Sequence, residues 1–142
     1  MSRFKNWNPP KFYKKIGNLY ETKYGWAVSY PQCLGLGKNV DVGYGTYIQA
    51  RYGVFIGDFT QLGASVKIYS DNTINNIKGE IIIGKNCLIG TNSVIFPNVI
   101  IEDDSFIYAF SLIKSDTTIK KGEIWAGIPA KKKGVIKNDQ NM

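Results

Sequence analysis

Isoleucine recurs at every sixth position through the second half of the chain. The series is Ile83, Ile89, Ile95, Ile101, Ile107, Ile113 and Ile119. A helix repeats every 3.6 residues and a flat strand every two, so neither explains this period. A short strand, a tight turn and a second short strand on a new face do explain it, and three faces of six residues make a coil of 18. We therefore predict a parallel β-helix with inward-pointing aliphatic side chains, in which residues 18 apart stack about 4.8 Å from each other.

The same spacing reaches into the first half of the chain. It runs from Leu36 through Val42 to Ile48 and, after an offset of two residues at Val54-Phe55, from Ile56 through Leu62 to Ile68. Between Ile68 and Ile83 it is interrupted by polar, Asn-rich residues, which indicate a loop at a corner of the coil. We therefore predict an N-terminal cap over residues 1–34, a repeat domain over residues 35–134 with a loop at residues 69–82, and a flexible tail over residues 135–142.

Histidine is absent from all 142 residues, and its absence excludes several kinds of site. Neither a Ser-His-Asp nor a Cys-His centre can be built, and a zinc site with histidine ligands is excluded as well. The two cysteines, Cys33 and Cys87, form neither a disulfide framework nor a metal-ligand cluster, so we expect no metal and a reducing, cytoplasmic setting. The sequence has no run of 18 apolar residues and no signal-peptide segment, so we expect no membrane span.

The net charge of +7 suits nucleic acid, an anionic membrane or a phosphorylated small molecule as a partner. Basic residues gather in two blocks, from Arg3 to Lys23 and from Lys114 to Lys137. In the first block they alternate with aromatic residues, which suits either base stacking on nucleic acid or a cap over the open end of a β-helix. We favour the cap and expect no nucleic acid partner.

The hexads resemble the [LIV]-[GAED]-x-x-[STAV]-x pattern of the hexapeptide-repeat acyltransferases, in particular the sugar O- and N-acetyltransferases. The segment from Ala126 to Lys131 resembles the terminal A-G-N-P-A-K of that family, with Ile128 in place of Asn. The segment from Ile107 to Lys114 resembles its I-G-A-G-S-V-V-T/K, with Tyr108 and Phe110 in place of two glycines. This resemblance implies a left-handed β-helix, acetyl-CoA as co-substrate, and a homotrimer with each active site in a groove between neighbouring subunits.

The resemblance also indicates where acetyl-CoA would lie. In the family the cofactor stretches along the coils, and terminal basic residues meet its phosphates. We therefore expect a wall made by Gly90 and Thr91 one coil below Ala109 and Ser111, with Lys114 and Lys131 at the phosphates and Lys132 and Lys133 adding positive charge. Tyr108 and Phe110 either narrow this groove or face the neighbouring subunit.

The predicted loop carries the candidate site for the acceptor. Similar acetyltransferases have I-Y-S-H/D-N-H there, with a His as general base, but this chain has Asp71 and Thr73 where His would stand. The family's base therefore cannot be transferred to any residue. We expect Asp71 to hold the acceptor amine, with Asn72 and Ser70 orienting hydroxyls and Glu80 as a weaker candidate. Asp71 as an Asx-turn residue that only shapes the loop is an equal alternative.

The missing base favours an amine as the acceptor. A sugar hydroxyl is too weak an acid to attack a thioester without a base, whereas an amine with a pKa of roughly 8 is partly neutral near pH 7. We therefore predict an acetyl-CoA-dependent acetyltransferase acting on the amino group of a nucleotide-linked amino sugar, in surface polysaccharide biosynthesis. A sugar O-acetyltransferase and a non-catalytic β-helix scaffold remain as alternatives.

Overall fold

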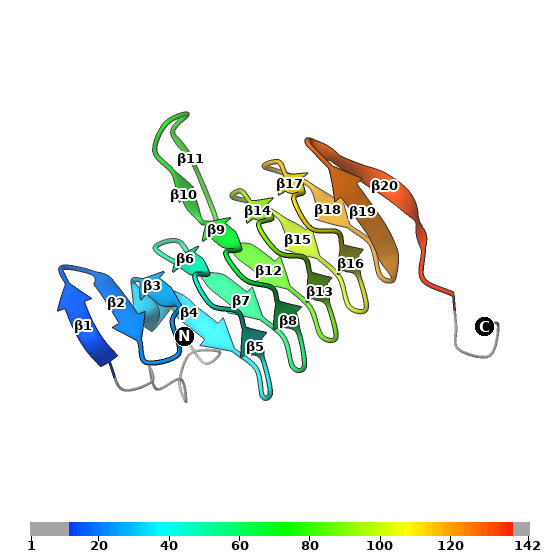
Figure 1. Ribbon diagram of the computed structural model, residues 1–142. Helices are drawn as coiled ribbons and strands as arrows, with labels where there is room; N and C mark the ends of the chain where they lie inside the picture. The colour runs from blue at the N-terminus through cyan, green and yellow to red at the C-terminus, as the bar shows by residue number, and fades with distance from the viewer. Residues whose placement is uncertain (1–11, 138–142) are drawn as a thin grey trace.

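The computed structural model describes residues 12–137 as a left-handed parallel β-helix with three sheets (Figure 1). Sheet 1 contains β1 (Phe12–Ile16), β2 (Leu19–Thr22), β3 (Ala27–Ser29), β6 (Tyr47–Gln49), β9 (Lys67–Tyr69), β14 (Val94–Ile95) and β17 (Leu112–Ile113). Sheet 2 contains β4 (Leu34–Leu36), β7 (Val54–Ile56), β12 (Ile81–Ile83), β15 (Ile100–Ile101) and β18 (Thr118–Ile119). Sheet 3 contains β5 (Asp41–Val42), β8 (Gln61–Leu62), β13 (Leu88–Ile89), β16 (Phe106–Ile107), β19 (Glu123–Gly127) and β20 (Ala130–Val135).

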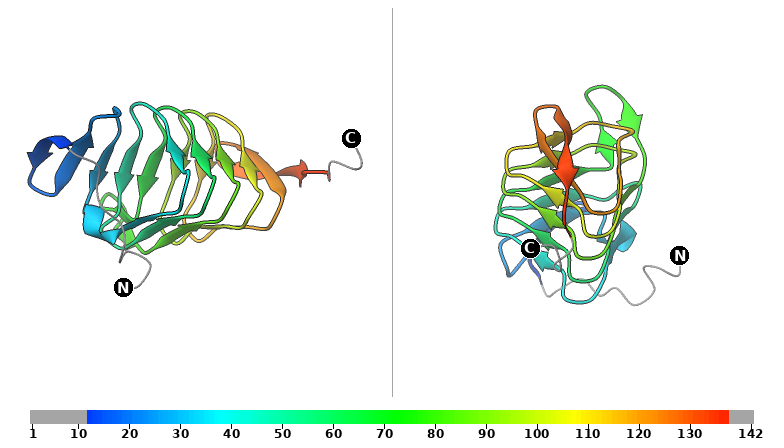
Figure 2. Two further views of the ribbon diagram at one scale, coloured as in Figure 1. Left: turned by 90° about the horizontal axis from the view of Figure 1, so that it is seen from below. Right: turned by 90° about the vertical axis from the view of Figure 1, so that its right-hand side faces the viewer.

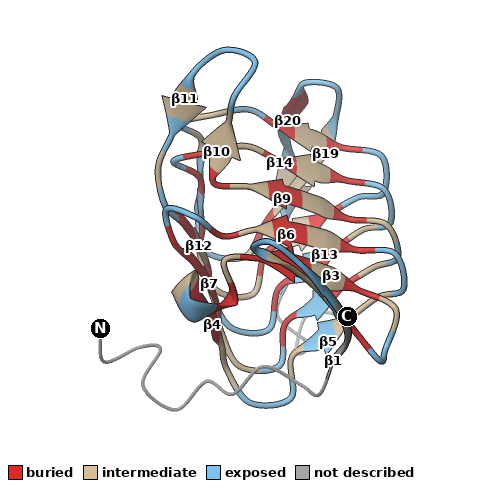
Figure 3. Cartoon of the chain, turned by 90° about the vertical axis from the view of Figure 1, so that its left-hand side faces the viewer, coloured by how far each residue is buried: buried red, intermediate tan, exposed pale blue. Residues whose placement is uncertain are grey.

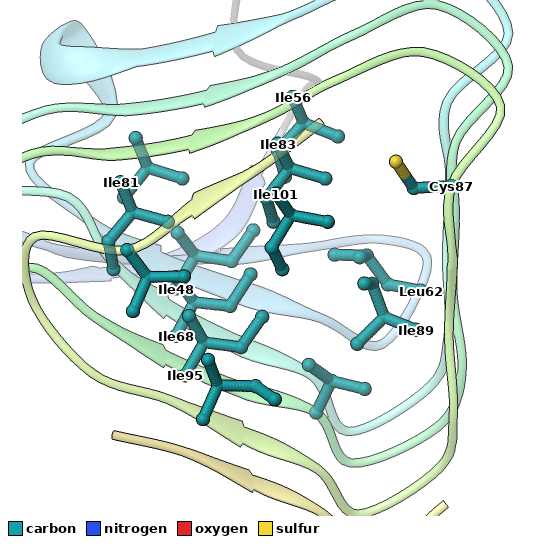
Figure 4. Packing of buried hydrophobic residues seen from close by; sticks show 14 of the residues in the cluster. Ile48, Ile56, Leu62, Ile68, Ile81, Ile83, Cys87, Ile89, Ile95 and Ile101 are labelled. Atoms are coloured by element: carbon teal, nitrogen blue, oxygen red, sulfur yellow. The ribbon is translucent and has the colours of Figure 1, made fainter. Parts of the chain in front are cut away.

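The register of the parallel strands confirms the predicted stacking. Ile83 pairs with Ile101 and Ile101 with Ile119 on sheet 2, while Ile95 pairs with Ile113 on sheet 1. These side chains form columns inside the prism, as Figure 4 shows for Ile56, Ile83 and Ile101. Each member of the isoleucine series is at most 2% exposed, so the interior of the coils is filled by its own side chains.

The strands stay in register although the chain between them varies in length. Leu36 pairs with Ile56, and Ile56 with Ile83. The surplus residues all leave the coil at one corner, between sheets 1 and 2. This corner holds the 3-10 turn η2 (Pro31–Cys33), the segment 50–53, and the hairpin of β10 (Asp71–Asn72) and β11 (Ile77–Lys78), which projects from the prism in Figure 2.

The loop is shorter than the predicted 69–82, because Tyr69 completes β9 and Ile81 begins β12. The two residues that flank the loop pair with strands of the coil below, Tyr69 with Gln49 and Ile81 with Val54. The excursion therefore spans residues 70–80, and the exposed tip of the hairpin stands clear of the buried interior in Figure 3.

Antiparallel strands extend one sheet at each end of the prism. At the first coil β1, β2 and β3 form an antiparallel meander, and β3 then pairs parallel with β6. The parallel ladder thus starts at Ala27, earlier than the predicted boundary at residue 35. At the other end β20 folds back antiparallel on β19, so Val135 lies in a strand and not in the predicted tail. The basic and aromatic residues before 12 and the residues after 137 lie outside the described part of the chain. Within residues 12–137, no helix is long and apolar enough to cross a membrane.

Ile101→Asp is expected to prevent folding, because it places an unpaired carboxylate in a fully buried column at a cost of about 5 kcal/mol or more. Ile100→Asp is the matched control, since Ile100 precedes it on β15 and is 41% exposed. Circular dichroism and urea unfolding should show a folded control and an unfolded Ile101→Asp. Equal stability of the two variants would contradict the inward orientation of the column.

Candidate functional site

A groove with a volume of about 440 Å³ lies between the β10–β11 hairpin and the outer face of sheet 1. The hairpin contributes Asp71, Asn72, Thr73 and Ile74. Sheet 1 contributes Tyr69 and Val94, and Phe96 lines the groove just after β14 ends. Ile68 and Ile95 point into the core, so their neighbours Tyr69 and Phe96 point outward, as the alternation of a strand requires. The groove therefore has an aromatic floor and a polar wall.

Asp71 lies on the polar wall with its side chain 10% exposed. Its Oδ2 atom is 3.8 Å from the Nη1 atom of Arg51, which stands at the same corner one coil below. The loop-shaping role belongs to its neighbour, because the Asn72 side-chain oxygen accepts the backbone N–H of Ile74 at 3.3 Å in an Asx turn. The carboxylate of Asp71 is thus held at the groove by an ion pair.

Ser70 does not take the role predicted for it. Its hydroxyl is fully buried, donates to Oε1 of Gln49 at 2.9 Å and accepts the backbone N–H of Tyr52 at 3.0 Å. It fixes the base of the hairpin on the coil below and cannot reach a substrate. Glu80 is exposed where the hairpin rejoins β12, and it is not among the residues that line the groove.

Tyr69 lines the groove, although the sequence pattern predicts it as part of the loop. Its ring lies between those of Tyr47 and Phe96, with centroids 5.9 Å and 6.3 Å away. Burial and the neighbouring Tyr47 raise the pKa of Tyr69, so its phenol stays protonated and able to donate a hydrogen bond at neutral pH. The sequence feature that predicts its outward orientation is its position directly after Ile68, the last inward-pointing residue before the repeat is interrupted.

The corner between sheets 3 and 1 carries the residues predicted to line the cofactor groove. Gly90 stacks directly under the next coil, because a Cβ atom there would lie 2.6 Å from the carbonyl carbon of Tyr108. The carbonyl of Thr91 accepts the backbone N–H of Phe110 at 2.9 Å, so the two turns lie one above the other as predicted. Thr91 and Ala109 are exposed at this corner, and so are the rings of Tyr108 and Phe110.

Ser111 is unavailable to a ligand, contrary to the prediction. Its buried hydroxyl donates to the carbonyl of Tyr108 at 2.7 Å and accepts the backbone N–H of Gly127 at 3.3 Å. The hydroxyl thus joins two consecutive coils from the inside. The sequence pattern marks this position as small, which is also what a buried corner requires.

The basic residues at the C-terminal end fall into two groups. Lys114 follows β17, and Lys131 lies on β20; both are exposed. Lys132 is instead paired, with its Nζ atom 3.0 Å from Oε2 of Glu123. It therefore adds less to the positive field than predicted.

Glu123 is the buried acid that anchors this end of the prism. Burial raises its pKa, but the backbone N–H of Lys120, the ammonium of Lys132 and the indole of Trp125 outweigh burial, so the pKa lies below its ordinary value. The hydrogen bonds from Lys120 and Trp125 measure 2.8 Å and 3.1 Å. Residues 12–137 contain no group of three His, Cys, Asp or Glu residues that could hold a metal ion.

The low pKa of Glu123 predicts acid-sensitive stability. Because the folded pKa lies below the ordinary 4.5, the ionised carboxylate stabilises the fold at pH 7. This contribution is lost as the pH falls below that ordinary value and through the folded pKa. Glu123→Gln should therefore lower the free energy of unfolding by about 1–3 kcal/mol at pH 7, and by progressively less towards pH 3. Urea unfolding across this range measures the difference, and Glu102→Gln, at a more exposed pair with Lys120, should change little.

Known proteins resemble this chain both in sequence and in structure. The bacterial transferase hexapeptide (six repeats) family matches residues 80–115. A dTDP-4-amino-4,6-dideoxy-D-glucose acyltransferase from Escherichia coli is 31% identical over 94 residues, covering 55% of this chain and 48% of that enzyme. The chain thus spans about half the length of this relative.

Two solved structures share the fold. A maltose O-acetyltransferase from Clostridium difficile 630 superposes with a TM-score of 0.70 at 23% identity, covering 78% of this chain and 63% of that one. A mutant of AntD, an N-acyltransferase from Bacillus cereus in complex with dTDP and coenzyme A, gives a TM-score of 0.69 at 21% identity, covering 87% and 84%. The resemblance drawn from the sequence is thereby confirmed: this chain carries the bacterial transferase hexapeptide repeat on the left-handed β-helix of the hexapeptide-repeat acyltransferases.

Proposed function

We propose that this protein transfers the acetyl group of acetyl-CoA to the amino group of a nucleotide-linked amino sugar. The observation that carries the proposal is the carboxylate of Asp71, held at an aromatic groove in a chain that contains no histidine. A carboxylate binds an amine or ammonium group well, but it is a weak base towards a hydroxyl. The E. coli relative, which acts on a dTDP-linked amino sugar, supports the same acceptor class.

The reaction needs no strong base when the acceptor is an amine. The neutral nitrogen attacks the thioester carbonyl, a C–N bond forms, and the carbonyl electron pair moves to oxygen. Collapse of this intermediate breaks the C–S bond and expels the CoA thiolate. The surplus proton on nitrogen passes to the thiolate or to water, and Asp71 stabilises the positive charge on nitrogen until it leaves.

The proposed cofactor site is the corner between sheets 3 and 1. Gly90, Thr91 and Ala109 would line the pantetheine arm at this corner. Lys131 on β20, and Lys114, which follows β17 at the opposite edge of sheet 1, would meet the phosphates as point charges. Solved relatives with the same fold contain coenzyme A or acetyl-CoA, which supports this cofactor.

A homotrimer is part of the same proposal. The groove beside the hairpin is open on the single chain, and Ile74 at the hairpin tip is 96% exposed, which suits burial against a second copy. The free thiols of Cys33 and Cys87 support a reducing, cytoplasmic setting. Surface polysaccharide biosynthesis is the pathway that we propose for the product.

Asp71→Asn is expected to lower kcat/KM about tenfold, or by about 1.4 kcal/mol, without abolishing activity, because the amine still attacks unaided. Release of CoA from acetyl-CoA with nucleotide-linked amino sugars measures the effect. Asp116→Asn is the matched control, since Asp116 is exposed on a later coil and does not line the groove.

The same assay with matched hydroxy sugars decides the acceptor. Turnover of amino sugars alone supports the proposal, whereas turnover of hydroxy sugars alone shows a sugar O-acetyltransferase. Absence of both turnover and CoA binding contradicts the proposal and favours a non-catalytic scaffold.

Lys131→Ala is expected to weaken CoA binding by about 1–3 kcal/mol, the usual loss when a charged hydrogen bond is removed. Added salt should weaken CoA binding more in the wild type than in the variant. Calorimetric titration measures both effects, with Lys85→Ala at the distant corner between sheets 2 and 3 as the control. Unchanged affinity in Lys131→Ala would move the phosphate site elsewhere.

A further inference from the structure

The corner between sheets 1 and 2 gathers cations and aromatic rings from three successive coils. Tyr30 comes from the coil beside β3, Arg51 and Tyr52 follow β6, and Lys78 lies on β11 of the hairpin. These four residues are called the corner cluster. They are brought together because every surplus segment of the chain leaves the prism at this corner.

The cations of the corner cluster lie against its rings. The guanidinium carbon of Arg51 is 5.6 Å from the ring centroid of Tyr30 and 5.5 Å from that of Tyr52. The Nζ atom of Lys78 is also 5.5 Å from the Tyr52 centroid. Two positive charges therefore share one aromatic ring at a partly exposed surface, which holds both side chains near each other.

The carboxylates nearby leave donors of both cations unused. Asp71 pairs with Arg51 at 3.8 Å, a long contact that occupies little of a guanidinium with five N–H donors. Lys78 has no carboxylate within 4.0 Å among the described residues. Glu80 follows Lys78 closely in sequence, yet its carboxylate is exposed and lies beyond that distance from both cations.

We infer, on the basis of the function proposed above, that the corner cluster binds the diphosphate of the nucleotide-linked amino sugar. A diphosphate presents oxygen pairs that match the fork of Arg51, and Lys78 supplies a second charge beside it. The site adjoins Asp71, which is the backbone partner of Lys78 in the antiparallel pairing of β10 and β11. A sugar bound with its amine at Asp71 would thus have its diphosphate at the corner cluster.

The ion pair between Arg51 and Asp71 would make the site selective for nucleotide-linked amino sugars over amino sugars without phosphate. While Arg51 faces Asp71, the carboxylate is partly neutralised and binds an amine less well. A diphosphate competes for the guanidinium and leaves Asp71 to the amine of the same substrate. An amino sugar without phosphate lacks this competitor, so the corner cluster selects for the nucleotide-linked form.

Coenzyme A also contains a diphosphate, so the two sources have to be separated by experiment. Calorimetric titration of the wild-type protein with dTDP, UDP, inorganic pyrophosphate, thymidine and CoA does so. The nucleoside diphosphates should bind, pyrophosphate should bind more weakly, and thymidine should show no measurable binding. Salt should weaken the binding of the diphosphates.

Lys78→Gln should weaken the binding of nucleoside diphosphate roughly tenfold and leave CoA affinity unchanged. Lys78 makes no ion pair within the described residues, so this variant should fold normally, which thermal unfolding checks. Arg51→Gln should have a larger effect, and Lys131→Ala should show the reverse selectivity. Lys38→Gln, an exposed lysine at the corner between sheets 2 and 3, is the charge-matched control.

Three results would overturn the inference: no binding of nucleoside diphosphate by the wild type, equal binding by the wild type and both corner-cluster variants, or loss of CoA affinity instead. Failure of the proposed function looks different. If the protein binds nucleoside diphosphate through Lys78 but acetylates no amino sugar, the inference about the corner cluster stands and the proposed function is wrong. If the protein acetylates nucleotide-linked amino sugars and the KM is unchanged in Lys78→Gln, the proposed function stands and the inference about the corner cluster is wrong.

Discussion

The hydrogen-bonded ladder between successive coils is the interaction on which the rest of this molecule depends. Gly57 donates to the carbonyl of Ile83 and Gly84 to that of Ile101, each at 2.8 Å, so each coil is held by its neighbours above and below. The isoleucine columns fill the space that the ladder encloses. Because the interior is solid, a binding site can form only on the outside of the prism, where a corner or an outer sheet face departs from the repeat.

The ladder also decides where such departures occur. Extra residues are tolerated where they leave the flanking strands paired, and here all of them collect at the corner between sheets 1 and 2. The hairpin of β10 and β11 is the largest, yet the strands on either side of it keep their partners on the coil below. Residues 50–53 make a smaller excursion beneath the hairpin. Arg51 and Asp71 meet for this reason, although they belong to different coils.

The hexad period predicts which side chains point inward, because that choice depends only on position within one coil. The columns of Ile83, Ile101 and Ile119 were therefore visible in the sequence. Contacts between coils at an irregular corner depend on offsets that the repeat does not contain. Arg51 is 20 residues before Asp71, not 18, and nothing in the sequence marks the pair. The sequence does not place Ser70 and Ser111 for a related reason. A small polar residue suits both a binding surface and a buried corner, and only the partners of its hydroxyl distinguish the two.

Sheet 1 connects the two halves of the proposed site. The corner with Gly90 and Thr91 precedes β14, and the corner that carries the hairpin follows the equivalent strand of the coil below. Between them the sheet is only two to three residues wide, roughly 7–10 Å at the rise of a β-strand. An acyl group arriving along the first corner and an amine held at Asp71 would therefore approach each other over Tyr69, Val94 and Phe96. The floor of the groove contributes apolar surface and the neutral phenol of Tyr69. The positive charges that would recognise the phosphates of the two substrates therefore have to come from the exposed cations at the two corners.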